Sequence, residues 1–136
     1  MTDPPAPSTI VATVPRWLDR RPRVGETVLV GFSPMDDDLA VCLALHPDAG
    51  PEDDLNAHRL LVADGAESVA VVAYTGRESS LLEVSLRFHA ACAARYGLDV
   101  IGVLVVVPAQ RDRSGYFRSL PDPTRIPLPT PAEETS

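Results

Sequence analysis

The six residues from Thr75 to Ser80, TGRESS, have the side chains best suited to binding an anion. They join a valine-rich run to a helix-like run, and ligands of open α/β sheets lie beyond the carboxyl ends of such strands. Free amides and the helix dipole would attract negative charge there, and Arg77 would add a positive charge. The candidate anion site consists of Thr75, Gly76, Arg77, Ser79 and Ser80. A tight loop with a capping serine explains the same residues, because one glycine is far short of a nucleotide-binding fingerprint.

Carboxylates and histidines in the first half of the chain raise the question of a metal site. One group is the acidic run 36–38, and a second group consists of His46, Asp48, Asp54 and His58. The two groups fall at opposite ends of a predicted strand, so they cannot easily converge. Carboxylates at 52–54 suit the first turn of a helix, where they complement its dipole. We therefore predict no metal site.

The residues that an acyl-transfer enzyme needs do not form a recognisable motif. Such chemistry uses a serine or cysteine on a strained turn beside a histidine base, and no Gly-x-Ser-x-Gly sequence occurs. His46 ends a predicted strand, His58 belongs to an acidic helix, and His89 falls on the apolar stripe of a later helix. We predict no catalytic residue and no cofactor, and an enzyme is the minority hypothesis.

Arginines interleaved with aromatic residues form two clusters, one near each end of the chain. The candidate interface residues are Arg16, Trp17, Arg20, Tyr116, Phe117 and Arg118. Arginine and aromatic side chains are enriched at interface hot spots, although such arginines also pair with a domain's own carboxylates. The leading hypothesis is a non-enzymatic protein-interaction or regulatory domain that binds a protein partner or self-associates. The alternative is an α/β domain that binds a small molecule with a phosphate or nucleotide-like anion.

The overall charge argues against two classes of partner. The 136 residues include 12 basic residues, all arginine, and 19 acidic ones, for a net charge of −7. Binding to nucleic acid or to an anionic membrane needs concentrated positive charge facing phosphates. No run approaches the about 20 apolar residues of a membrane span, and no signal peptide is recognisable. We therefore predict a cytoplasmic protein in which Cys42 and Cys92 are buried, small apolar residues.

Local signals in the first half predict two helices and three strands. A helix capped by Ser8 or Thr9 is expected to reach residue 21, interrupted or restarted at Pro15. Strands are predicted at 26–32 and 38–46, joined as an antiparallel hairpin by a short, turn-rich link. A helix begins at Pro51, because proline and three carboxylates suit a first turn, and ends near Gly65. A buried strand at 68–74 follows.

The second half continues the alternation of helix and strand. A helix is predicted from Ser80 to residue 97, with Ser80 and Glu83 as a capping box. Strands are predicted at 99–107 and 116–120, the second antiparallel to the first. Two strand–helix–strand units favour parallel neighbours. The predicted fold class is α/β, a single-domain Rossmann-like sandwich whose mixed sheet of about five strands is parallel at its centre and antiparallel outside.

Proline-rich ends set the expected domain boundaries. Residues 1–7 are predicted to be disordered, and residues 8–120 to form the α/β domain. Residues 121–136 are predicted to be an extended, proline-rich tail that adds little to the core, because repeated prolines cannot donate ladder hydrogen bonds.

A helix containing a proline and an aromatic residue, a second proline and a β-branched strand open the chain at 10–32. A glycine followed by aromatics, a serine and a leucine occurs at 114–120. Together these features resemble the amino-terminal domain of an actinobacterial family of uncharacterised proteins, a domain of unknown function. The resemblance covers 10–120, with departures at 19–20, where the family has Gly-Phe, and at 121–124, where it has Cys-Cys-Pro. It implies the fold and brings no known activity.

Overall fold

The structure, a computed structural model, describes residues 6–33 and 39–128. These residues form three helices, α1 (Pro7–Leu18), α2 (Pro51–Ala63) and α3 (Ser80–Arg95). They also form the strands β1 (Thr27–Phe32), β2 (Leu39–Leu45), β3 (Ser68–Tyr74), β4 (Asp99–Val107), β5 (Tyr116–Ser119) and β6 (Ile126–Pro127). The α/β class predicted from the sequence is confirmed.

The six strands belong to one mixed sheet in the order β2-β1-β3-β4-β5-β6. β1 pairs antiparallel with both β2 and β3, which confirms the predicted hairpin of β1 and β2. β3 and β4 form a parallel pair, and β5 and β6 continue the sheet with antiparallel pairing. The predicted strand–helix–strand unit would make β2 and β3 parallel neighbours. This prediction is wrong, because β1 lies between them. β2, β3 and β4 nevertheless run in one direction, so their carboxyl ends lie on one side of the sheet.

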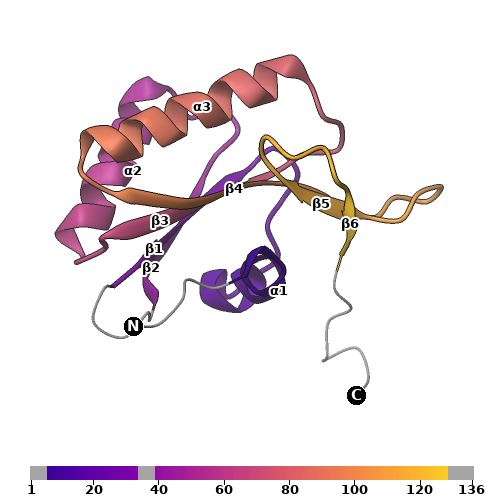
Figure 1. The fold of residues 1–136 in the computed structure, drawn as a ribbon, viewed down its shortest axis with the longest axis horizontal. Coiled ribbons are helices and arrows are strands. Elements are labelled where there is room, and N and C mark those ends of the chain that lie inside the picture. The colour runs from indigo at the N-terminus through magenta and orange to yellow at the C-terminus, as the bar shows by residue number, and fades with distance from the viewer. Residues whose placement is uncertain (1–5, 34–38, 129–136) are drawn as a thin grey trace.

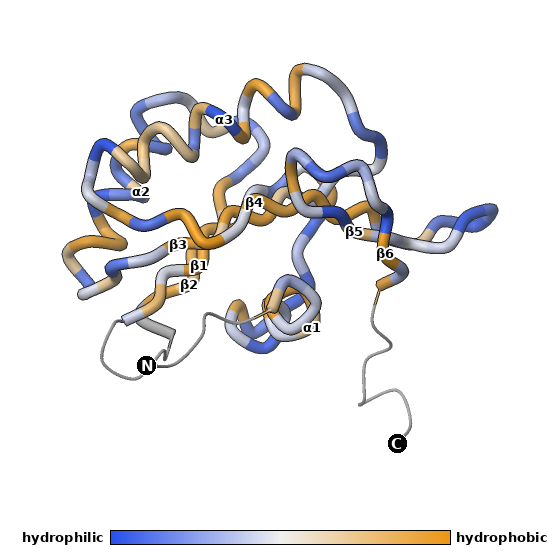
Figure 2. The backbone as a smooth tube through the Cα atoms, viewed as in Figure 1, coloured by the Kyte–Doolittle hydropathy of each residue, from blue (hydrophilic) through white to orange (hydrophobic). Residues whose placement is uncertain are grey.

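Helices cover both faces of the sheet, with α1 on one face and α2 and α3 on the other (Figure 1). Val28 and Val30 of β1 pack with Val14 of α1, whereas Leu29 packs in the cluster that includes Leu61 of α2. Successive strand residues point to opposite faces, so a strand between two helical layers is apolar along its length. Hydrophobic residues accordingly run through the central strands, while the β4–β5 loop that projects from the sheet is hydrophilic (Figure 2).

α1 is one continuous helix rather than the interrupted helix predicted from the sequence. Pro7 occupies its first turn, where a backbone N–H has no partner within the helix. Ser8 and Thr9 therefore lie inside the helix and do not cap it. Pro15 also lies inside α1. The helix stops because Asp19 adopts a left-handed backbone conformation, with φ 61°.

The cap of α3 lies one residue before the predicted position. Ser79 is the N-cap, and its Oγ accepts a hydrogen bond from the N–H of Leu82 at 3.2 Å. Ser80 is the first helical residue, so the predicted capping box of Ser80 and Glu83 is wrong. Glu83 instead accepts a hydrogen bond from Arg118 of β5 at 3.0 Å.

The last described segment adds a strand that the sequence did not predict. Ile126 and Pro127 pair with β5, and the N–H of Leu128 donates to the carbonyl of Gly115 at 3.3 Å. Proline can occupy an edge strand, where its missing N–H breaks no ladder on the open side. Part of the predicted tail therefore joins the sheet.

Candidate functional site

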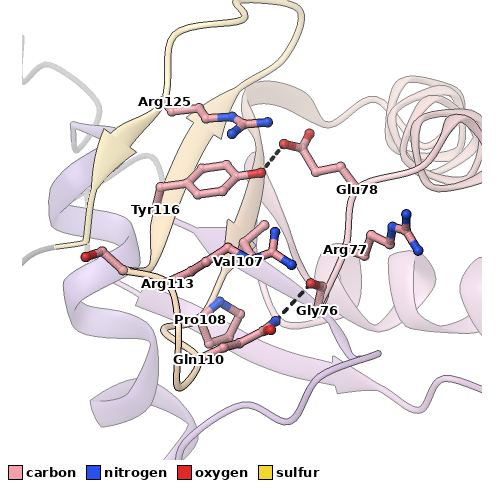
Figure 3. Close-up of a pocket in the computed structure, with 10 residues that line it drawn as sticks. Gly76, Arg77, Glu78, Val107, Pro108, Gln110, Arg113, Tyr116 and Arg125 are labelled. Carbon is pink, nitrogen blue, oxygen red and sulfur yellow. Dashed lines mark hydrogen bonds between the residues drawn. The ribbon is translucent and has the colours of Figure 1, made fainter.

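A pocket of about 440 Å³ opens at the carboxyl ends of β3 and β4 (Figure 3). Its walls come from the β3–α3 loop, the end of β4 with the loop after it, the start of β5, and the residue before β6. The lining residues are Gly76, Arg77, Glu78, Val107, Pro108, Gln110, Arg113, Ser114, Tyr116 and Arg125. The volume is within the range of about 300 to 1,000 Å³ that is usual for small-ligand sites.

Three arginines and one glutamate give the lining a positive charge. Arg77, Arg113 and Arg125 carry +3 and Glu78 carries −1, a net +2 in a chain whose total charge is −7. A concave surface with an excess of one sign of charge concentrates the electrostatic field. The charge of the lining is therefore opposite in sign to the net charge of the whole chain.

Both carboxylate oxygens of Glu78 accept hydrogen bonds. The Tyr116 hydroxyl donates to Oε2 at 2.5 Å, and Nε of Arg118 donates to Oε1 at 2.6 Å. Burial alone would raise the pKa of Glu78, but these two hydrogen bonds, together with the positive charges of Arg118 and Arg125, hold the pKa below its ordinary value. Burial, and then the hydrogen bond to Glu78, raises the pKa of Tyr116. Glu78 therefore stays ionised and Tyr116 stays protonated, so this pair orients the pocket wall.

Arg125 lies over the ring of Tyr116, with Cζ 4.6 Å from the ring centroid (Figure 3). A cation–π contact engages the face of the ring, and the guanidinium group carries five N–H donors. The segment around Leu128 lies close to the backbone at Gly115. A Cβ added to Gly115 would lie 2.5 Å from Cδ1 of Leu128 and 2.7 Å from N of Ala109. The segment that carries Arg125 therefore closes one side of the pocket.

The structure separates the five predicted anion-site residues into two groups. Gly76 and Arg77 line the pocket. Thr75 and Ser79 instead fix the loop, because Oγ1 of Thr75 donates to the Arg77 carbonyl at 2.6 Å and Ser79 caps α3. Ser80 lies in the first turn of α3, outside the lining.

Several pocket residues were not among the sequence candidates. Nε2 of Gln110 donates to the Gly76 carbonyl at 3.0 Å and ties the loop after β4 to the loop after β3. Gln110 and Arg113 follow the predicted strand 99–107, so the preference of ligands for strand carboxyl ends could have indicated them. Arg125 had no such signal, since it fell in the predicted tail.

The three aromatic interface candidates do not form an exposed cluster. Phe117 is fully buried in the core, so its side chain cannot contact a partner. Trp17 is half-buried and packs edge-on against Phe32, with ring centroids 5.7 Å apart. Tyr116 belongs to the pocket wall. The prediction that Phe117 contacts a partner is therefore wrong.

Two of the arginine interface candidates form ion pairs within the chain. Arg20 holds Glu26 through two hydrogen bonds of 2.8 and 2.6 Å, and the N–H of Arg23 donates to the same carboxylate at 2.6 Å. The hydrogen bond from Arg20 is the largest cause that lowers the pKa of Glu26 to about 2, with burial opposing it. Arg118 pairs with two carboxylates in the same way, and Arg16 is exposed on α1. Arg20 and Arg118 thus stabilise the domain's own fold.

His58 and His89 are buried together between α2 and α3. Their rings stack with centroids 5.9 Å apart, and Nε2 of His89 lies 3.9 Å from a carboxylate oxygen of Asp54. Burial lowers the pKa of His89, although the charge of Asp54 opposes this effect. His46 is exposed after β2. None of the three histidines lines the pocket.

Within 6–33 and 39–128, no three His, Cys, Asp or Glu side chains gather to hold a metal ion. The acidic run 36–38, which the sequence raised as a source of metal ligands, lies outside those ranges. In the same part of the chain, no helix has the length and apolar content that crossing a bilayer requires.

No protein-family model matches this chain, and no similar sequence was found among curated proteins. The resemblance of residues 10–120 to the actinobacterial family stays a prediction. The support for the candidate site therefore comes from the geometry and the charge of the pocket.

Proposed function

We propose that this chain is a single ligand-binding domain of Rossmann-like type, whose pocket takes a small organic molecule bearing a phosphate or carboxylate group. The observation that most supports this function is the set of three arginines around one pocket of about 440 Å³ in an acidic chain. Arginine binds both anions through paired N–H donors. The position at the carboxyl ends of strands is also the usual ligand position in α/β sheets.

The proposed role is binding rather than catalysis. Ser114 and Tyr116 supply the hydroxyl groups of the lining, and no histidine lies in that lining to act as their base. The Tyr116 hydroxyl is also engaged by Glu78. A regulatory domain in the cytoplasm that responds to a metabolite fits this arrangement.

The proposal is tested by measuring thermal unfolding with a panel of sugar phosphates, nucleoside monophosphates and dicarboxylates. A ligand bound only by the folded state at 100 times its Kd adds about 2.7 kcal/mol to the free energy of unfolding. This corresponds to a rise in Tm of roughly 10 °C for a domain of this size. At least one compound of the panel is expected to give a saturable rise.

Arg113→Ala and Arg77→Ala are expected to reduce that rise strongly, because each removes a positive charge from the lining. The matched control is Arg16→Ala, which removes the same charge from the exposed surface of α1. An equal rise in the pocket variants and in the control would contradict the proposed site. A panel with no rise at 10 mM ligand would contradict the function.

A further inference from the structure

The two outer strands of the sheet differ in how they are protected from pairing with another chain. Sheets usually guard an outer strand by making it short or by placing charges or proline on it. β6 follows this pattern, since it has two residues and one is Pro127. β2 has seven residues, LAVCLAL, without a charge or a proline. Within the described residues, β2 therefore lacks the short length and the proline that guard β6.

The described side chains of β2 are all apolar and all partly exposed. Val41, Leu43 and Leu45 border the core cluster under α2 and α3, while Cys42 and Ala44 border the cluster under α1. None of residues 41–45 is fully buried. Both core clusters thus continue to the β2 edge, where another strand would cover them.

The sequence of β2 is nearly the same in both directions about Cys42. In the regular part of the strand, an antiparallel copy centred there would place Cys42 opposite Cys42 and Val41 opposite Leu43. Directly opposed residues of antiparallel strands share one face and contact each other. A two-fold dimer needs such a self-complementary surface. A register shift in the β1–β2 ladder precedes Val41, so the central pairs lie in the regular part of the strand.

We propose that two copies of this chain pair antiparallel through β2, with the two-fold axis at Cys42. The six strands of each copy would then form one continuous sheet of twelve. The apolar side chains on each face of β2 would contact their equals on the second copy. The residues of β2 carry no charge, so the strand pairing itself places no like charges opposite one another, although each chain has a net charge of −7. This dimer does not depend on the ligand pocket, which lies by β4 and β5.

The proposed axis makes a specific prediction about the two cysteines. Opposed Cα atoms of antiparallel strands lie about 4.5 to 5.5 Å apart, which is within the range of about 4.4 to 6.8 Å for a disulfide. Oxidation by air with copper phenanthroline would remove two protons and two electrons from two Cys42 thiols and join their Sγ atoms. Burial raises the pKa of Cys42 to about 11, so the reaction is run at pH 8.5 for hours. Cys92 is buried and 4% exposed.

The test combines this cross-linking with mass measurement by light scattering. Wild type is expected at about twice 14.6 kDa, with a covalent dimer after oxidation. Cys42→Ser should lose the cross-link and keep the mass. Leu43→Glu should give a monomer, because it brings charge into the apolar contact. The matched control is Ile126→Glu on β6, which is expected to stay dimeric.

Each alternative result overturns the proposal. A wild-type mass of one chain at 0.5 mM protein would exclude the dimer. A dimer that cross-links through Cys92, or does not cross-link, would place the contact elsewhere, as would a dimer that Ile126→Glu dissociates and Leu43→Glu does not. If Leu43→Glu fails to fold, the wild-type mass and the Cys42 cross-link still decide.

Discussion

Glu26 is the residue whose replacement we expect to change stability most predictably. Its carboxylate joins the end of α1 to the start of β1 through Arg20 and the N–H of Arg23, and the residue is 6% exposed. Its pKa is about 2, against 4.5 for an unperturbed glutamate. Each unit of pKa corresponds to about 1.36 kcal/mol, so the full difference is worth about 3 kcal/mol.

Solvent reduces this value, because the Arg20 side chain is 41% exposed. We therefore expect Glu26→Gln to lower the free energy of unfolding by about 2 kcal/mol at pH 7, and Tm by roughly 8 °C. Because the pKa of Glu26 is lower in the folded state than in the unfolded state, the unfolded chain protonates Glu26 first as the pH falls. The contribution of Glu26 is thus complete above about pH 5 and is lost as the pH falls towards 2.

The assay is urea unfolding followed by circular dichroism at pH 7, 5, 4 and 3. The gap between wild type and Glu26→Gln should be widest at pH 7 and narrow steadily below pH 5. Asp112→Asn, which makes the same charge change in an exposed loop, is the matched control and should follow wild type. A gap that stays constant from pH 7 to pH 3 would refute the reasoning, as would a variant as stable as wild type at pH 7.

Three further predictions concern other parts of the fold. Burial lowers the pKa of His89, so the unfolded chain binds a proton at His89 more readily than the folded chain, and the free energy of unfolding should fall as the pH drops below about 6.5. In urea unfolding, His89→Leu should make the free energy of unfolding depend less on pH in this range. The control His46→Gln, at an exposed site, should leave that pH dependence unchanged. Gly115→Ala should lower the free energy of unfolding by about 1 to 3 kcal/mol, because the added Cβ would collide with Leu128 and with backbone atoms. The measurement is calorimetric, and the control is Gly102→Ala, where an added Cβ meets nothing within 4 Å. A chain ending at Leu120 should keep its circular dichroism spectrum and lose anion binding with Arg125; unchanged binding would contradict the pocket wall described above.

The sequence predicted the central strands well because their signals are strong and local. The boundaries of β3 and β4 match the predicted 68–74 and 99–107. Both are β-branched or small apolar runs that follow glycine-ended helices, and Gly65 and Gly97 do adopt the positive φ that ends a helix. Such runs can be read without knowing what packs on them.

The pairing of the strands could not be read in the same way. β1 and β2 are both apolar on both faces, so the sequence does not say which of them receives β3. Five of the six residues of β1 are buried, which reflects its place between two strands. The pocket escaped prediction for a related reason, since Arg113 and Arg125 meet only after β4, β5 and β6 have paired.

Because β6 comes last among the described strands, the wall of the pocket that carries Arg125 is synthesised after the rest of the sheet. The chain is synthesised from its amino terminus, so α1 through β5 precede Arg125 and Leu128. Most residues of both core clusters are therefore available before the last pocket wall exists. The proposed anion would therefore contact Arg125 only in chains whose synthesis has passed this residue. Binding at the proposed site would thereby distinguish chains that include Arg125 from folded chains that stop before it.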